Sequence, residues 1–335
     1  MRISFVGGGT DLEAFYRHAT GRVISTAINM YSYVTINRPP LLANKVSASY
    51  AVHEIASHPS ELQNHRVREA LLHFGILKDM HVTSISDVPV KTGLGSSSSF
   101  SVALVKALFA AQEKHVDKGE IAEAAAHLEI NRVKEPIGKQ DHYAATFGGL
   151  NIFEFNGDGS VKVIPVRLDY KQRLDFERHL FLFYTGLTRD ASSVLTEQKA
   201  NTENKLETLK AMAGSVFNFR DKLMAGDYKG LGEMLHEGWL KKKSLATNVS
   251  NTTIDALYDA GMKNGAWGGK VLGAGGGGCI LFIAAPDKHE RILSALTKIA
   301  AKKNLSEFAE IPVKFVQAGV EVLMNNDHAG KVASV

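Results

Sequence analysis

The segment 89–99 contains two glycines followed by a run of four serines, between an apolar stretch and a helix-periodic one. Gly93 and Gly95 let the backbone turn tightly, and the serines at 96–99 supply hydroxyl groups where a helix is expected to begin. The first amides of a helix are unpaired and carry a partial positive charge, which suits a phosphate group. The segment therefore predicts a phosphate-binding loop, with a Gly/Ser-rich surface loop as the alternative. It is not a P-loop, because no lysine follows Gly95.

A second group of residues lies at the start of the chain. Arg2 leads a short apolar strand, and the three glycines at 7–9 are followed by Thr10 and Asp11. Glycines allow a backbone to approach a ligand closely, and a carboxylate can accept hydrogen bonds from sugar hydroxyls. This pattern favours a sugar-binding turn, with a plain β-turn and a capping residue as the alternative.

Two carboxylates, Glu129 and Asp141, stand twelve residues apart, one at a helix end and one beyond a loop. Phosphoryl transfer needs charge neutralisation, which Mg²⁺ commonly supplies, and an oriented hydroxyl nucleophile. A metal ligand and a base would meet both needs. The alternative is a pair of solvated helix-end carboxylates.

The tract 273–278 has five glycines in six positions, more than a turn requires. Such a backbone can lie against a ligand or against another loop. Tight packing of a helix entry against a neighbouring strand is the structural alternative.

Composition narrows the class of protein. The chain has 335 residues, a net charge of +4 and a single cysteine, Cys279, within an apolar run. Its length predicts two domains, and its one cysteine predicts a buried thiol in a reducing compartment. No apolar run approaches the ~20 residues of a bilayer crossing, so we expect neither signal peptide nor membrane span. The basic run 241–243 is interpreted as a solvated helix face, not a nucleic-acid site.

These residues must be positioned by a mixed set of strands and helices. Alternating segments at 3–6, 21–28 and 31–36 predict an antiparallel ribbon, and others predict strands at 151–155 and 313–323. Helical periodicity appears at 100–111, 121–133, 252–263 and 286–303, and for some sixty residues from 189 with a break at Gly226. Asp117 and Glu120 have capping-box spacing. Without a regular β-α-β alternation, the order indicates an α+β architecture.

The four segments, in this order, resemble the GHMP kinases, the family of galactokinase, homoserine kinase and mevalonate kinase. The family's second motif, Pro-x₃-Gly-Leu-x-Ser-Ser, matches from Pro89 to Ser97, and its glycine-rich third motif matches 270–279. In galactokinases the first motif places an arginine nine positions before a sugar-binding aspartate, the separation of Arg2 and Asp11. Segments 2–11, 140–145, 184–192 and 239–245 look most similar to bacterial D-glycero-D-manno-heptose 7-phosphate kinases.

The resemblance implies a two-domain GHMP kinase fold. Residues 1–170 would form an ATP-binding N-terminal domain like ribosomal protein S5 domain 2. Residues 171–335 would form a ferredoxin-like C-terminal domain, with the active site between the two.

The resemblance also assigns roles to residues. Asp141 would be the catalytic base, with Arg2 keeping it ionised and countering charge on the transferred phosphoryl group. ATP would be held by Pro89, Lys91, Gly93, Leu94, Gly95, Ser96, Ser97, Ser98 and Ser99. Mg²⁺ would be bound by Ser97, Ser98 and Glu129. The substrate would be held by Gly8, Gly9, Thr10, Asp11, Arg189, Ser192, Gly275 and Gly276, with Arg189 and Ser192 on its phosphate.

The implied activity is ATP-dependent phosphorylation of the anomeric C1 hydroxyl of D-glycero-D-manno-heptose 7-phosphate, giving the 1,7-bisphosphate. Two alternatives stay open: an anomeric kinase for a neutral sugar (fucose, galactose or an N-acetylhexosamine), and a non-catalytic sugar and nucleotide sensor. Sensors tend to lose parts of the catalytic set, which is complete here. We expect a cytoplasmic enzyme, a homodimer, that has no nucleic-acid or membrane partner.

Overall fold

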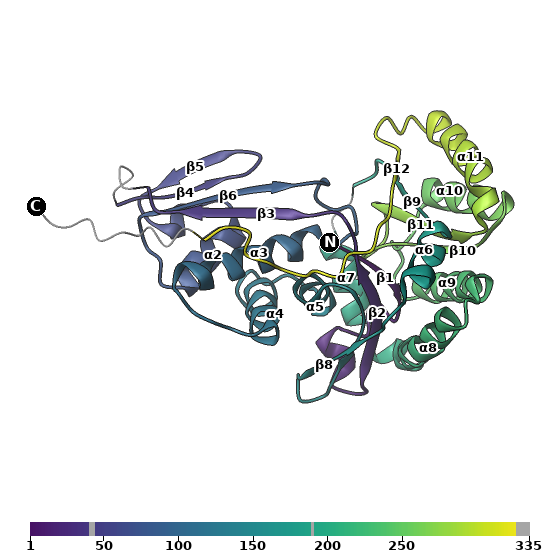
Figure 1. The fold of residues 1–335 in the computed structure, drawn as a ribbon, viewed down its shortest axis with the longest axis horizontal. Coiled ribbons are helices and arrows are strands. Elements are labelled where there is room, and N and C mark those ends of the chain that lie inside the picture. The colour runs from purple at the N-terminus through teal and green to yellow at the C-terminus, as the bar shows by residue number, and fades with distance from the viewer. Residues whose placement is uncertain (40–43, 189–190, 326–335) are drawn as a thin grey trace, which may run out of the picture.

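The computed structural model describes residues 1–39, 44–188 and 191–325. In this part of the chain the strands form three four-stranded sheets, with helices packed between and outside them (Figure 1). Strands and helices follow one another without a regular alternation, which confirms the α+β class. None of the described helices is both long enough and apolar enough to cross a bilayer.

The first sheet has the strand order β1-β2-β7-β8, and all neighbouring strands are antiparallel. Its strands are β1 (Arg2–Val6), β2 (Gly21–Ala27), β7 (Leu150–Phe155) and β8 (Val161–Pro165). The register shifts between Ser4 and Val6, which bends β1 just before its glycine turn. One helical turn, α1 (Glu13–Tyr16), follows that turn. The predicted first two strands are thus confirmed.

The second sheet has the order β3-β6-β4-β5, with β4 and β6 parallel. Its strands are β3 (Ser32–Asn37), β6 (Met80–Ser86), β4 (Val46–Ser49) and β5 (His53–Ala56). The prediction that β3 extends the ribbon of β1 and β2 is wrong, because β3 pairs with β6. The physical reason is burial: Val34 and Ile36 pack onto the apolar core of this sheet and its helices. Figure 1 shows the sheet lying over α2 and α3.

Helices fill the space between the first two sheets. They are α2 (His65–His73), α3 (Ser96–Ala111), α4 (Lys118–His127) and α5 (Gln140–Phe147), with a 3₁₀ turn at Pro59–Glu61. The capping box of Asp117 and Glu120 is confirmed, with both hydrogen bonds at 2.8 Å. Helix α4 continues as a π-helical segment, Leu128–Arg132, which carries Glu129. Such π-helical insertions are frequent at functional sites.

The third sheet, of order β10-β11-β9-β12, belongs to the second half of the chain. Its antiparallel strands are β10 (Ala266–Val271), β11 (Cys279–Ala284), β9 (Leu180–Tyr184) and β12 (Ala309–Ile311). The helices of this half are α6 (Tyr170–Arg178), α7 (Ala191–Ala200), α8 (Leu206–Met224), α9 (Tyr228–Lys243), α10 (Thr252–Lys263) and α11 (His289–Lys302). Two 3₁₀ turns, Glu203–Lys205 and Pro286–Lys288, precede α8 and α11. The helical stretch broken at Gly226 is confirmed.

One apolar core connects the first and third sheets. Ile3 and Phe5 of β1 belong to the same buried cluster as Phe219 of α8 and Leu281 of β11. The Phe5 and Phe219 rings stack with centroids 5.3 Å apart. The halves 1–170 and 171–335 therefore share a core across the predicted boundary, and the boundary itself stays a prediction.

The prediction of a strand at 313–323 is wrong. After β12 the chain returns to the first sheet, where Phe315 forms a single bridge with Ile28. The Gly149 amide then donates to the Val316 carbonyl oxygen at 3.0 Å, and the Val316 amide donates to the Ala27 carbonyl oxygen at 3.1 Å. Phe315 is buried against Phe5, with ring centroids 6.5 Å apart, so the segment is held by this ring and by scattered backbone hydrogen bonds instead of a continuous strand ladder.

Candidate active site

The predicted phosphate-binding loop enters α3 at Gly95. Gly95 has a left-handed backbone (φ 74°), and Gly93 has φ 80°, so both positions favour glycine. The N-cap residue provides no side-chain cap to the helix, which leaves the first-turn amides without that partner. Ser97 is half-buried at this end, whereas Ser98 is buried. This geometry fits a phosphate-binding helix end, and ATP binding by these residues remains a prediction.

The two glycine-rich segments pack against each other. A Cβ atom on Gly93 would lie 2.5 Å from the Leu272 carbonyl oxygen, and one on Gly273 would lie 2.7 Å from Gly93 Cα. The Cys279 amide donates to the Thr92 carbonyl oxygen at 2.9 Å. The sequence left open whether the tract 273–278 lies against a ligand, another loop or a strand. The structure shows it packed against another loop, 92–93. The second half of the chain thereby fixes the shape of the phosphate-binding loop.

Arg2 and Asp141 form a two-point ion pair. Arg2 Nε donates to Asp141 Oδ1 and Nη2 donates to Oδ2, both at 2.7 Å. Arg2 Nη1 also donates to the Gly93 carbonyl oxygen at 2.5 Å. Arg2 is 4% exposed, while the Asp141 side chain is 22% exposed and lines a pocket. The pair therefore presents a fixed carboxylate to the pocket, directly beside the phosphate-binding loop.

Asp11 is held at the end of the glycine turn. Its carboxylate accepts hydrogen bonds from Gln140 Nε2 (2.8 Å), the Gln140 amide (3.2 Å) and the Gly9 amide (3.2 Å). Burial, and after it the charge of Asp141, raises the pKa of Asp11 to about 6, against the effect of these hydrogen bonds. A Cβ atom on Gly138 would lie 2.1 Å from Asp11 Oδ2, so glycine is required there.

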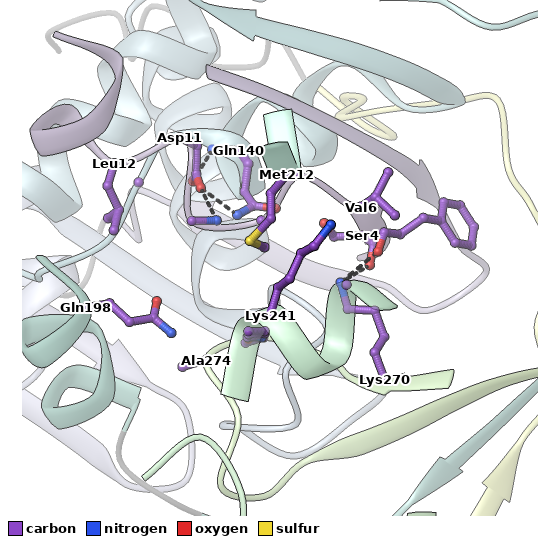
Figure 2. A pocket seen from close by; sticks show the side chains of 18 of the residues that line it. Ser4, Val6, Asp11, Leu12, Gln140, Gln198, Met212, Lys241, Lys270 and Ala274 are labelled. Carbon is purple, nitrogen blue, oxygen red and sulfur yellow. Dashed lines mark hydrogen bonds between the residues drawn. The ribbon is translucent and has the colours of Figure 1, made fainter. Parts of the chain in front are cut away.

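A pocket opens between the two halves of the chain, and Figure 2 shows the side chains around it. Its walls come from β1 and the glycine turn, from α5, and from α7, α8, α9, β10 and the second glycine tract. Arg2, Asp11 and Asp141 all line it. The structure thus brings the predicted catalytic pair and the predicted sugar-binding carboxylate into one cavity.

The basic run 241–243 is not a solvated helix face, so that interpretation is wrong. Lys242 is 8% exposed and donates to the Gly273 carbonyl oxygen, and burial lowers its pKa to about 8. Lys241 lines the pocket next to it. Only Lys243 behaves as expected, with its ammonium 3.6 Å from Asp255 Oδ1. The physical reason is that α9 packs its last turn against the second glycine tract.

Glu129 is fully buried and is a hub of hydrogen bonds. Its carboxylate accepts from Arg66 Nε, the Ser97 hydroxyl (3.2 Å), the Ser98 hydroxyl (2.7 Å) and His142 Nε2 (2.7 Å). Burial alone would raise the pKa of Glu129, but the His142 and Arg66 partners outweigh it and hold the pKa well below its ordinary value. Arg66 also pairs with Glu135 at 3.1 Å.

This arrangement does not fit Glu129 as a direct ligand of Mg²⁺. Each carboxylate oxygen already receives two hydrogen bonds, one of the four from a guanidinium. The described residues also contain no cluster of three or more His, Cys, Asp or Glu side chains suited to a metal. Glu129 accepts hydrogen bonds from the Ser97 and Ser98 hydroxyls. The lone pairs of both hydroxyl oxygens therefore point away from Glu129.

Four other residues predicted to bind substrate contact the protein itself and are not among the residues that line the pocket. Thr10 is fully buried, and its hydroxyl lies 2.8 Å from the Gly7 carbonyl and 2.9 Å from the Arg22 backbone, so it holds the turn and does not reach the pocket. Ser192 donates to Glu135 at 3.3 Å and is not among the described lining residues. The Gly276 amide donates to the Val249 carbonyl at 2.7 Å, and Gly275 packs on Val249.

Residues at the edge of the loop complete this comparison. Pro89 and Lys91 are exposed, Ser96 and Ser99 are buried, and Leu94 is fully buried in the shared core. Gly8 and Gly9 line the pocket, and substrate binding by them stays a prediction. Arg189 lies outside the described residues.

Sequence reasoning missed Arg66, Lys241 and Lys270. Lys270 is 8% exposed and donates to the Ser4 and Phe5 carbonyl oxygens at 3.0 and 2.8 Å, which fastens β10 to β1. The partners of Arg66 and Lys270 lie far away in the sequence, so only the fold shows what each of them contacts. The one available signal was Lys241 next to two more lysines before a glycine tract.

Comparison with known proteins decides the family. The model of the GHMP kinases N terminal domain matches residues 64–149, and that of the GHMP kinases C terminal domain matches residues 219–302. The chain belongs to the GHMP kinase family. It is therefore a phosphotransferase with an alcohol acceptor, and GHMP kinases use ATP as the phosphate donor.

Relatives of this kinase cover nearly its whole length. It is 29% identical over 311 residues to the D-glycero-alpha-D-manno-heptose 7-phosphate kinase of Campylobacter jejuni, covering 89% of this chain and 91% of that one. It is 25% identical to the L-fucokinase/L-fucose-1-P guanylyltransferase of Bacteroides fragilis, covering 90% of this chain but 36% of the longer relative.

Solved structures confirm the two-domain GHMP kinase fold. A D-glycero-D-manno-heptose 1-phosphate kinase from Bacteroides thetaiotaomicron superposes with a TM-score of 0.76 at 23% identity, covering 95% of both chains. Lactococcus lactis galactokinase, complexed with galactose, superposes with a TM-score of 0.75 at 18% identity, covering 95% of this kinase and 92% of that chain. At these identities the likeness establishes the fold alone.

Proposed function

We propose that this kinase transfers the terminal phosphoryl group of ATP to the anomeric C1 hydroxyl of D-glycero-D-manno-heptose 7-phosphate, giving the 1,7-bisphosphate and ADP. The observation that carries the proposal is the position of the Asp141 carboxylate, fixed by Arg2 between the phosphate-binding loop and the pocket. The heptose substrate is supported by the 29% identical relative that shares almost the full length.

In the proposed reaction Asp141 accepts the proton of the attacking hydroxyl as the new P–O bond forms. General bases of this kind contribute on the order of 10²–10⁴-fold to a rate. Arg2 prevents the carboxylate from rotating, because its fork holds both oxygens. The end of α3 supplies partial positive charge to the phosphates, and charge placed in advance costs no reorganisation during transfer.

The pocket wall next to this centre suits a polyhydroxylated ligand. Asp11 accepts from Gln140, and three further buried polar atoms have no hydrogen-bond partner among the described residues: Ser4 Oγ, Gln140 Oε1 and Gln198 Nε2. All three residues line the pocket. Polar side chains at a cavity wall can supply donors and acceptors, so these three residues support a ligand with several hydroxyl groups.

Mg²⁺ enters the proposal only as a cation that accompanies the nucleotide. Among the residues predicted to bind it, the Ser97 hydroxyl is the one that the structure leaves half-buried with a lone pair directed away from Glu129. A location in the cytoplasm and a homodimer likewise remain proposals.

The proposal is tested by measuring ADP release with a panel of acceptors: heptose 7-phosphate, unphosphorylated heptose, fucose, galactose and an N-acetylhexosamine. We expect turnover to be fastest on heptose 7-phosphate, with phosphorus NMR showing a new anomeric phosphate. Faster turnover on a neutral sugar would contradict heptose 7-phosphate as the substrate and would favour that sugar, as the similarity to the fucokinase also allows. Binding of sugar and ATP without turnover on any acceptor would indicate a sensor.

A further inference from the structure

Four cationic side chains line the pocket: Arg2, Lys241, Lys242 and Lys270. Three of them are engaged by the protein itself. Arg2 is paired with Asp141, Lys242 donates to the Gly273 carbonyl oxygen, and Lys270 donates to two carbonyl oxygens of β1.

Lys241 differs from the other three. Its ammonium group forms no hydrogen bond or ion pair within the described residues, although Glu237, one helical turn earlier, also lines the pocket. Figure 2 shows its side chain extending from α9 into the cavity instead of out along the helix surface. A half-buried ammonium group at a pocket wall is available to pair with an anionic group of a ligand.

The same pocket has room for a bulky anionic group. The turn Gly7–Gly9 forms part of its wall without any side chain, and a Cβ atom on Gly8 would meet nothing within 4 Å. Of its two lining aspartates, Asp141 is paired with the Arg2 guanidinium, whereas the Asp11 carboxylate accepts hydrogen bonds from the neutral donors of Gln140 and Gly9. Glu237 at the pocket wall has no cationic partner within the described residues either, so Lys241 is the lining cation, not the only lining charge, that the protein leaves unpaired there.

We infer that Lys241 binds the phosphate group of a phosphorylated sugar and thereby selects sugar phosphates over neutral sugars. The inference rests on the proposed function and adds the residue that determines its specificity. A lysine recognises phosphate as a compact point charge with three donors, so it needs no preformed planar site. A neutral sugar would gain little from this ammonium group.

The test compares Lys241→Met with the matched control Lys243→Met on two acceptors, heptose 7-phosphate and the same heptose without its phosphate. Lys243 lies two residues away and faces Asp255 and the Trp239 ring, outside the pocket. For Lys241→Met we expect kcat/KM on the phosphorylated acceptor to fall on the order of 10- to 100-fold, as for a lost hydrogen bond between charged groups. Turnover of the neutral heptose and the KM for ATP should stay unchanged. Lys243→Met should match the wild type on both acceptors.

The outcomes separate the two proposals. If the wild type prefers heptose 7-phosphate and Lys241→Met keeps that preference, the role of Lys241 is overturned while the proposed function stands. An equal loss on both acceptors would also overturn it, since the residue would then serve the sugar and not the phosphate. If the wild type itself turns over only neutral sugars, the proposed function fails. Should Lys241→Met not fold, Lys241→Gln and Lys241→Arg replace it, and only the arginine variant should keep the preference.

Discussion

Arg2 and Asp141 are 139 residues apart in the chain, yet two hydrogen bonds of 2.7 Å join the guanidinium of one to both carboxylate oxygens of the other. The same guanidinium donates to the Gly93 carbonyl oxygen. One side chain on β1 therefore sets the direction of the carboxylate and the position of the phosphate-binding loop together. In the proposed reaction, the placement of the base relative to the phosphate determines whether the attacking hydroxyl is aligned, so Arg2 would hold both parts of the proposed site in place.

Replacing Asp141 by asparagine should remove the proton acceptor but keep the size of the side chain. We expect kcat to fall on the order of 10²–10⁴-fold while the variant still binds ATP, because Arg2 can keep its hydrogen bond to the Gly93 carbonyl oxygen. Initial rates of ADP release and calorimetric titration with ATP measure the two quantities. A variant that keeps more than about a tenth of the rate would show that alignment, rather than proton removal, dominates.

Arg2→Lys should retain the charge but lose the fork. A single ammonium cannot hold both oxygens of Asp141 and the Gly93 carbonyl at once, so we expect kcat to fall by about 10- to 100-fold, a few kcal/mol of lost charge-assisted hydrogen bonding. Arg22→Lys is the matched control, since Arg22 pairs with Glu154 at 2.7 Å in the same sheet without lining the pocket. Equal kinetics for the two variants would contradict the role given to the fork.

Gly93→Ala should separate the two glycine-rich segments. Its new methyl group would lie 2.5 Å from the Leu272 carbonyl oxygen, and the residue already has φ 80°. We expect a higher KM for ATP together with a lower unfolding midpoint. Gly75→Ala is the control: it has φ 68° but open space around its Cβ, so it should cost only the ~1–2 kcal/mol of a left-handed backbone and leave the KM for ATP unchanged. Similar KM values for both variants would refute the packing argument.

Sugar binding should weaken as the pH falls through about 6. Burial and the neighbouring Asp141 raise the pKa of Asp11 to about 6, and a protonated carboxyl loses acceptor capacity for sugar hydroxyls. Below that pH the dissociation constant of unphosphorylated heptose should rise about tenfold per pH unit. The neutral sugar is the right probe, since a sugar phosphate itself titrates near pH ~6. Asp11→Asn should show no such limb; if its pH profile matches the wild type, another group is responsible.

Much of the fold was predictable because its patterns are local. The strands beside the glycine turn, the capping box of α4 and the helix beginning at Ser96 all depend on residues within one or two turns of each other. The motif order likewise placed Arg2, Asp11 and Asp141 at one site. Local patterns, however, do not specify which strands pair: β3 pairs with β6 instead of β2 and packs on a different apolar core.

The rest of the site depends on contacts between distant segments. Arg66 reaches Glu129 from 63 residues away, and Lys270 reaches β1 from more than 260. No spacing rule connects such residues, so their burial and partners emerge only from the fold. The lysine run shows the same limit, since three adjacent residues of one type end in three different environments.

Glu129→Gln should destabilise the protein strongly at neutral pH. Because the pKa of Glu129 is held well below its ordinary value of 4.5, its ionised form adds stability above pH 4.5, and this stability is lost as the pH falls toward the lower folded-state pKa. Removing the charge leaves Arg66 without its buried partner, a loss on the order of 3–5 kcal/mol. Urea unfolding should give a free energy of unfolding far below that of the wild type at pH 7, and a smaller difference at pH 4.

Glu135→Gln is the control. The Glu135 side chain is 25% exposed beside the same arginine, so the substitution should cost under ~1 kcal/mol. A difference for Glu129→Gln that is independent of pH would mean that shape, and not charge, makes this residue necessary.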